Sequence, residues 1–177
     1  NALGYNNPEA YALISEGDTD AVFQLEQGGM KRFMKDLKPD CLEDIIAGVA
    51  LYRPGPMAYI PTYIENKLNP SKVKYDTPLL EHILKVTYGV IIYQEQVMQI
   101  FQDLAGFSLG QADLVRRAMG KKNKAELMAQ KEKFISGNID QGGNIEGAVS
   151  RGVPKEVAEK VFGDMESFAS YAFNKAH

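Results

Sequence analysis

The chain has 177 residues, of which 45% are hydrophobic, enough for one domain with a buried core or for a piece of a larger protein. Its net charge of −3 excludes an assignment to nucleic-acid binding from overall charge alone, and its single cysteine, Cys41, excludes an intramolecular disulfide and a cysteine-rich zinc site. We find no signal-peptide pattern and no apolar run long enough to cross a bilayer. The sequence therefore predicts a cytoplasmic protein without a membrane partner.

The first helix is expected to begin at Asn7-Pro8, because Asn is a good N-cap and Pro suits the first helical turn, and to end at Gly17. Residues 22–25 (Val-Phe-Gln-Leu) have the composition of a short strand. Asp18 and Asp20 precede that segment at a spacing that a metal site could use. Their place beside a glycine favours turn hydrogen bonds instead, so we predict no metal ligand here.

Further helices are predicted over about 30–37, 40–52, 59–68 and 77–86. Asp40 and Glu43 have the spacing of a capping box for the second of these. Its apolar stripe is predicted to be core: Leu42, Ile45, Ile46 and Val49. Cys41, beside the cap, is expected to be a small hydrophobe rather than a reactive thiolate. The Arg-Pro-Gly-Pro run at 53–56 then ends the helix in a rigid loop.

The central part of the chain is expected to hold a second short strand and a long helix. Residues 89–93 form a compact apolar run that is typical of a buried strand. From Gln94 to Gly106 the apolar residues follow the helical period, namely Val97, Met98, Ile100, Phe101, Leu104 and Ala105. His82 has no second ligand at metal-binding spacing, so we expect an ordinary surface or packed histidine.

Two helix ends are predicted to meet near residues 120–122. Ser108 and Gln111 have the spacing of a capping box that starts a helix, and Gly120 is well placed to end it. A second helix is expected to begin after Asn123 as N-cap, with Glu126 at its third position.

Positive charge is concentrated around this junction. Residues 116–133 include seven basic and two acidic residues, a net charge of +5 that leaves −8 for the rest of the chain. The basic residues are Arg116, Arg117, Lys121, Lys122, Lys124, Lys131 and Lys133.

The helix dipole separates these cations into two groups. Two arginines near the negative end of the first helix are favourable by roughly 0.3–1 kcal/mol each. Lys121, Lys122 and Lys124 crowd the positive end of the next helix, where a cation has the wrong sign. A bound phosphate would remove that cost, because the N–H groups at a helix start favour anions. On charge alone, a phosphate-binding junction and a solvated basic turn are equally good hypotheses.

The remaining segments complete a mainly helical domain with up to two short strands. The buried face of the helix after Asn123 is predicted from Leu127, Met128, Phe134 and Ile135. Residues 137–152 contain five glycines and are expected to form a mobile loop, after which Val153-Pro154 opens the last helix. We predict a single domain over 1–177 that is a fragment of a longer chain. The sequence contains no G-x-x-x-x-G-K-[ST], H-E-x-x-H or G-x-S-x-G motif.

Five stretches of the sequence, in this order, resemble the bacterial replicative DNA polymerase III alpha subunit family, the C-family polymerases. They are residues 22–26 (VFQLE), 50–57 (ALYRPGPM), 88–100 (YGVIIYQEQVMQI), 116–122 (RRAMGKK) and 171–177 (YAFNKAH). The resemblance extends from about residue 10 to the last residue. It implies the fingers domain of a DNA-directed DNA polymerase, a nucleotidyltransferase of DNA replication.

The resemblance also implies roles for individual residues. Arg116, Arg117, Lys121 and Lys122 match the residues that face the nucleotide triphosphate. Nucleotide- or template-facing positions are matched by Tyr171, Asn174, Lys175 and His177, with Arg53 as a weaker candidate. Tyr171 has two alternative roles, which we consider equally good hypotheses: stacking near the nascent base pair, or capping of the core at the helix end.

No catalytic residue or metal ligand of the family matches a residue of this chain. The resemblance implies that Mg²⁺ is held by palm aspartates outside it, so the fragment alone is expected to be inactive. The implied partners are primer-template DNA, the incoming dNTP, the rest of the alpha subunit and the replisome. The alternatives are a stand-alone helical nucleic-acid-binding module and a purely structural interaction domain.

Overall fold

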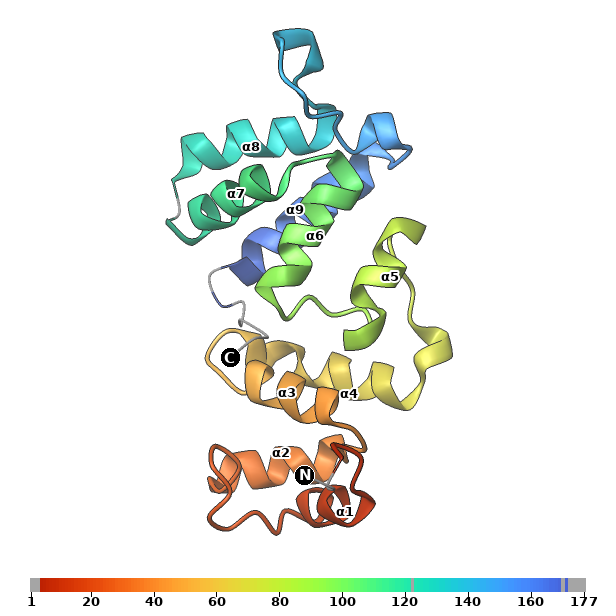
Figure 1. The fold of residues 1–177 in the computed structure, drawn as a ribbon, viewed down its shortest axis with the longest axis vertical. Helices are drawn as coiled ribbons and strands as arrows, with labels where there is room; N and C mark the ends of the chain where they lie inside the picture. Colours follow the sequence, from red (N-terminus) through yellow and green to blue (C-terminus); the bar gives the residue numbers. More distant parts are fainter. Residues whose placement is uncertain (1–3, 122, 170, 172–177) are drawn as a thin grey trace. The chain divides into compact units, whose positions relative to one another are not determined.

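The computed structural model describes residues 4–121, 123–169 and 171, and within them it is mainly α-helical, as the sequence predicted (Figure 1). The chain divides into two compact units, Asn1–Pro70 and Ser71–His177, which we call the first and second unit. Apart from one bridge residue at Tyr93, the described residues contain no strand. No helix in this part of the chain combines the length and the apolar character that crossing a membrane requires.

The first unit contains α1 (Pro8–Glu16), α2 (Gly28–Leu37), α3 (Leu42–Leu51), the 3₁₀ turn η1 (Pro56–Tyr59) and α4 (Ile60–Leu68). The second contains η3 (Pro78–Leu80), α5 (Glu81–Leu84), η4 (Lys85–Thr87), α6 (Gln94–Ala105), α7 (Leu109–Lys121), α8 (Lys124–Ser136), η5 (Ile139–Gln141), η6 (Val149–Arg151) and α9 (Lys155–Ala169). A short 3₁₀ turn, η2 (Pro70–Lys72), spans the boundary.

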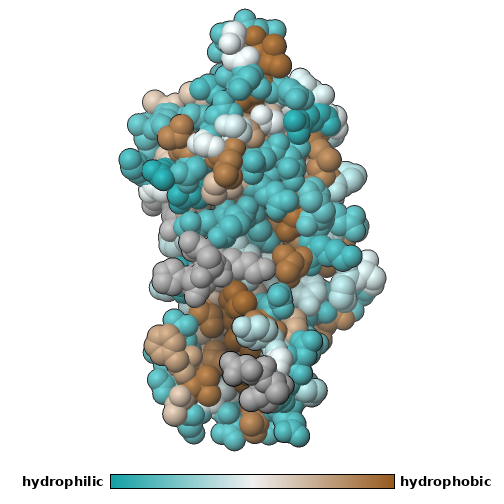
Figure 2. Space-filling model, in the orientation of Figure 1, coloured by the Kyte–Doolittle hydropathy of each residue, from teal (hydrophilic) through white to brown (hydrophobic). Residues whose placement is uncertain are grey.

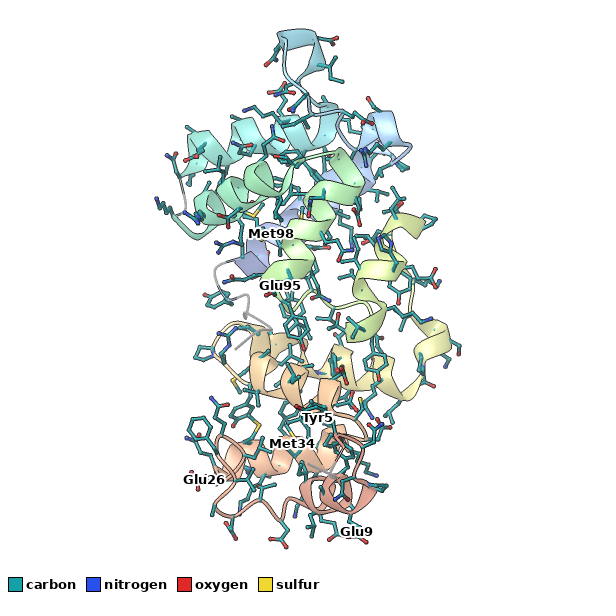
Figure 3. All side chains as sticks on the ribbon, viewed as in Figure 1. Tyr5, Glu9, Glu26, Met34, Glu95 and Met98 are labelled. Atoms are coloured by element: carbon teal, nitrogen blue, oxygen red, sulfur yellow. The ribbon has the colours of Figure 1, made fainter. Side chains whose placement is uncertain are left out.

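Local signals set the first helix as predicted. The Asn7 side chain accepts hydrogen bonds from the N–H groups of Glu9 and Ala10, and Gly17 ends α1 in the left-handed conformation with φ 72°. In the packing of α2 on α3, the side chain of Met34 extends from α2 toward α3 (Figure 3). A Cβ at Gly48 would lie 2.7 Å from Met34 Cε, so a larger residue there would force the Met34 side chain to shift.

The predicted strand at 22–25 is wrong, because this segment forms two consecutive turns. The N–H of Val22 donates to the Thr19 carbonyl, and the N–H of Leu25 donates to the Val22 carbonyl. Ala21 and Gln24 have φ of 63° and 65°, which no strand residue adopts. The preceding Asp20 forms an ion pair with Lys31, in agreement with a turn rather than a metal site.

The predicted capping box and apolar stripe of α3 are also wrong. Cys41, not Asp40, is the N-cap, and it makes no side-chain capping hydrogen bond. Leu42, Ile45, Ile46 and Val49 are only half-buried. The fully buried positions are Asp44, Ala47, Gly48, Ala50 and Leu51. Small residues face α2 because they allow the two helices to pack closely. Large apolar residues occur on several sides of α3, so the apolar period of the sequence did not identify the buried side.

The core of the second unit is built around α6. Phe101 is fully buried and contacts the rings of Phe107, Phe134 and Phe162 at centroid distances of 5.1–6.1 Å. The predicted face of α6 is confirmed except for Met98, which is half-buried.

The second predicted strand is buried as expected but is not a strand. Val90, Ile91 and Ile92 lie in the core, and side-chain hydrogen bonds replace a sheet partner. The amide oxygen of buried Gln96 accepts from the N–H groups of Ile92 and Tyr93 at 2.9 and 3.0 Å.

The buried face of α8 is correct for Leu127, Phe134 and Ile135, but Met128 is 69% exposed. Met128 is seven residues before the buried Ile135 and lies on the same side of α8, so its position around the helix does not explain its exposure. The side that Ile135 buries near the C-terminal end of α8 is open to solvent at Met128, nearer the start of the helix.

The glycine-rich segment projects beyond the end of α8 (Figure 1) but is tied to the core. The N–H of Gly147 donates to the Ala105 carbonyl at 2.9 Å, and the N–H of Ala148 donates to the Phe134 carbonyl at 2.7 Å. Arg151 donates from Nη1 to the Gln102 and Asp103 carbonyls near the end of α6. The half of the segment that contains these anchors is held to the core by hydrogen bonds, which argues against the predicted mobile loop there.

Candidate functional site

The junction between α7 and α8 begins with the predicted capping box. The N–H of Ser108 donates to Gln111 Oε1 at 2.8 Å, and the N–H of Gln111 donates to Ser108 Oγ at 3.2 Å. At the other side of the junction, Asn123 caps α8 by accepting from the N–H of Glu126 at 3.3 Å. Both helix starts are therefore where local sequence signals placed them.

The prediction that Gly120 ends the first helix is wrong, because α7 continues to Lys121. A glycine inside a helix costs only about 1 kcal/mol relative to alanine. Buried Val115, Ala118 and Met119 fix this part of α7 on the domain. Lys121 thus occupies the last turn of α7, where a cation suits the dipole.

This changes the dipole argument for a phosphate. It no longer applies to Lys121, and Arg116 and Arg117 both lie before the last turn rather than in it. It still applies to Lys124, the exposed first residue of α8. Lys122 lies outside the described residues.

Both arginines of the junction pair with one carboxylate, Asp113. Its Oδ1 accepts from Arg116 Nε at 3.1 Å and from Arg116 Nη2 at 2.8 Å. Its Oδ2 lies 2.8 Å from Arg117 Nη2. The hydrogen bond from Arg116, together with attraction to both guanidinium groups, holds the pKa of Asp113 below its ordinary value.

The two arginines differ in exposure. The Arg116 side chain is 21% exposed, whereas that of Arg117 is 63% exposed. Arg117, Lys121 and Leu114 share the outer side of α7 at helical spacing, and all three are exposed. On the face shown in Figure 2 the surface of the second unit is mostly hydrophilic. The junction therefore presents cations to solvent and to any ligand.

The other predicted site residues are described only in part. Tyr171 follows α9, is 44% exposed, and donates its N–H to the Phe168 carbonyl at 2.9 Å. Asn174, Lys175 and His177 lie outside the described residues.

Arg53 belongs to the first unit. Its Nε donates to the Ala50 carbonyl at 3.0 Å, so this side chain stabilises the C-terminal end of α3. Burial lowers the pKa of its guanidinium, which stays charged at neutral pH.

Among the described residues, one group of side chains has metal-ligand types in close proximity, namely Asp40, Cys41 and Asp44 within 4.8 Å of one another. Lys67 Nζ already lies 3.4 Å from Asp40 Oδ2 and 3.2 Å from Asp44 Oδ2. Burial raises the pKa of the Cys41 thiol, which supports the prediction that it is not a reactive thiolate. We interpret this group as a structural ion-pair cluster.

Sequence reasoning missed two aspartates that organise these regions. Asp113 stands three and four residues before the two arginines, which is the spacing of helical ion pairs. Asp44 stands three, four and seven residues before Ala47, Gly48 and Leu51, a spacing that places it on their buried face. In both cases a test of helical spacing would have found the residue.

His82 Nε2 lies 2.8 Å from Asp103 Oδ2, at an exposed position. This agrees with the prediction of an ordinary histidine.

Comparison with known proteins gives a consistent family. Residues 1–142 match the family model described as the bacterial DNA polymerase III alpha subunit finger domain. The chain is 52% identical over 178 residues to the DNA polymerase III subunit alpha of Aquifex aeolicus, with 99% of this chain and 14% of the relative covered. It is 50% identical over 171 residues to that of Treponema pallidum, with 97% and 14% covered. For Halalkalibacterium halodurans the identity is 47% over 175 residues, with 99% and 15% covered.

The chain thus spans about one seventh of the length of these relatives. A match over most of the chain, together with identities near one half, shows the family. The chain belongs to the finger-domain family of the bacterial DNA polymerase III alpha subunit.

Proposed function

We propose that this domain is the nucleotide- and DNA-gripping part of a bacterial replicative DNA-directed DNA polymerase. In this role the α7–α8 junction binds the triphosphate of the incoming dNTP through Arg116, Arg117, Lys121 and Lys122. Support comes from relatives whose name is DNA polymerase III subunit alpha and from the exposed cations at the junction.

One observation carries the proposal furthest: Arg117 and Lys121 are exposed one turn apart on the outer side of α7. A guanidinium can grip two phosphate oxygens at once, and an ammonium adds a compact point charge. Together they suit a chain of phosphates better than a single small anion. A purely solvated basic turn does not require the two cations to share one helix face.

The chemistry explains why cations are needed at this position. In nucleotidyl transfer the primer 3′-oxygen attacks the α-phosphorus of the dNTP and pyrophosphate leaves. Negative charge on the departing phosphates increases during the reaction, so fixed cations stabilise the transition state. They also align the triphosphate with the attacking oxygen, which lowers the entropic part of the barrier.

We propose further contacts from Tyr171, Asn174, Lys175, His177 and Arg53 to the nucleotide or the template. The exposed ring of Tyr171 has a face on which a base can stack, a contact worth roughly 1–3 kcal/mol in nucleic-acid complexes. The partners of the intact protein are then primer-template DNA, the incoming dNTP, the rest of the alpha subunit and the replisome.

The Mg²⁺ that such a reaction uses does not fit the carboxylates of the described residues. Asp20 is paired with Lys31, and the Asp40–Cys41–Asp44 cluster is paired with Lys67 and includes a thiol, whereas Mg²⁺ prefers oxygen ligands. We therefore assign the ion to palm aspartates elsewhere in the intact polymerase. The 177-residue chain alone is expected to show no primer extension.

The test is Arg117→Ala in the full-length alpha subunit. Loss of a charge-assisted contact to phosphate predicts at least about a tenfold rise in the KM for dNTP in single-nucleotide primer extension. Arg32→Ala on α2 is the control, because Arg32 is also an exposed helical arginine.

An unchanged KM in Arg117→Ala would remove the proposal. Weaker binding to duplex DNA without nucleotide, at an unchanged KM for dNTP, would instead favour a module that contacts only the DNA backbone.

A further inference from the structure

The geometry around Asp113 brings two side chains together that would otherwise diverge. Arg116 and Arg117 are adjacent, so their Cα–Cβ bonds point about 100° apart around α7. Asp113 lies one turn earlier and receives both of them, Arg116 on Oδ1 and Arg117 on Oδ2. The two guanidinium groups therefore converge on one carboxylate.

The guanidinium groups of Arg116 and Arg117 can lie close together only because the Asp113 carboxylate is between them. Two guanidinium groups held close together repel each other, and a negative charge between them offsets that repulsion. The three side chains together keep a net charge of +1, so the cluster still attracts an anion. Arg116 uses Nε and Nη2 for its hydrogen bonds to Asp113, and the Arg117 side chain is 63% exposed, so both arginines keep N–H donors for a ligand.

The two arginines differ in exposure, so they are expected to have different roles. Arg116, which is less exposed, gives two N–H groups to the same carboxylate oxygen. Arg117 is mostly exposed and, among the residues that the structure describes, pairs with Asp113. Arg116 is thus fixed, and Arg117 is held in place but accessible.

We propose that Asp113 is a positioning residue: it holds Arg116 and Arg117 together so that both can contact one triphosphate. This inference rests on the proposed function of the α7–α8 junction. The opposite role is that of a competitor, a carboxylate that merely occupies the arginines and repels phosphate. The two roles predict opposite changes in nucleotide affinity when the charge of Asp113 is removed.

The experiment is Asp113→Asn in the full-length alpha subunit, assayed by single-nucleotide primer extension. Asparagine keeps the shape but is neutral and has an NH2 donor in place of one carboxylate oxygen, so the acceptor that one of the two arginines uses is lost. We expect the KM for dNTP to rise about threefold to tenfold, with kcat changed less than about twofold. Asp113→Glu, which can still pair with both arginines at helical spacing, should restore the KM to within about twofold.

The matched control is Asp164→Asn, because Asp164 also forms an exposed helical ion pair, with Lys160. We expect this variant to leave the KM unchanged. Arg117→Ala is assayed in parallel, so that two kinds of failure are distinguishable. If Arg117→Ala has no effect, the proposed function fails.

If Arg117→Ala raises the KM while Asp113→Asn leaves it unchanged or lowers it, only the positioning role is overturned. A rise of similar size in Asp164→Asn would overturn it as well. A lowered thermal unfolding temperature of Asp113→Asn, with activity lost through unfolding, would assign Asp113 a purely structural role and contradict the proposal.

Discussion

Two aspartates in the molecule pair with cations in different surroundings. Asp44 on α3 is 1% exposed; it accepts from Tyr63 Oη at 3.4 Å and lies 3.2 Å from Lys67 Nζ. Asp113 on α7 is 28% exposed and pairs with two arginines, one of which is mostly exposed.

The two sites differ in whether the paired cation is still accessible to other groups. The Lys67 side chain is 11% exposed and lies near two carboxylates, so its charge is already neutralised within the first unit. Arg117 keeps most of its surface open to solvent. Similar ion pairs therefore bury the charge of the cation in one place and leave it open to solvent in the other, and burial decides which.

The largest expected effect is on stability at Asp44. Asp44→Ala leaves Lys67 and Tyr63 with one partner fewer in a buried site, so we expect the free energy of unfolding to fall by about 3 kcal/mol. Urea unfolding of the chain followed by circular dichroism measures it. Asp113→Ala, at a partly exposed ion pair that solvent screens, should lower the free energy of unfolding much less. Equal losses in the two variants would contradict the comparison.

A smaller effect is expected on the reactivity of the Cys41 thiol, which lies beside Asp44. Burial, with the nearby carboxylates, raises the pKa of Cys41, so less thiolate is present at neutral pH. Alkylation by iodoacetamide at pH 7.5 should be slower than that of a cysteine in an unfolded peptide. The rate should rise in Asp44→Ala, because a repelling charge is removed and packing is loosened. A rate equal to that of the peptide in the unaltered chain would show that Cys41 is not shielded.

The smallest effect is the pH dependence at Asp113. Because the pKa of this carboxyl is lowered in the folded state, its ion pairs add stability above its ordinary pKa of about 3.9. That contribution is lost as the pH falls through the lowered value. The small stability difference between the unaltered chain and Asp113→Asn, measured by urea midpoints, should therefore be present at pH 7 and shrink toward pH 3. A difference that grows on acidification would have the wrong sign.

Much of the helical framework was predictable because its signals are local. The Asn7 cap of α1, the Ser108–Gln111 capping box of α7 and the Asn123 cap of α8 all depend on side chains within three residues of the helix start. The apolar period of α6 was equally clear because one side of that helix is buried.

The failures have a different origin. Residues 22–25 have a strand-like composition, yet positive φ at Ala21 and Gln24 and the buried hydroxyl of Thr19, which donates to the Leu25 carbonyl at 2.6 Å, fix a pair of turns. These determinants depend on the surrounding fold, and composition does not encode them. The partial burial of the α3 stripe likewise depends on which side α2 covers.

The candidate site was predictable in its charges but not in its pairing. Summing charge along the chain identified the cations of the junction, while the carboxylate that organises two of them was counted only as one negative residue. The position of Gly120 inside α7 reversed the sign of the dipole contribution at Lys121, which shows how strongly such an argument depends on one helix boundary.

The anchors of the glycine-rich segment have a mechanical consequence. The backbone N–H groups of Gly147 and Ala148 link the end of α6 to α8, and the Arg151 side chain donates hydrogen bonds to carbonyl groups near the same end of α6. Since α7 packs against α6, α8 and α9, the anchors and these contacts join the four helices into one packed bundle. We therefore expect the cations of α7 to move together with α6, α8 and α9 rather than independently of them.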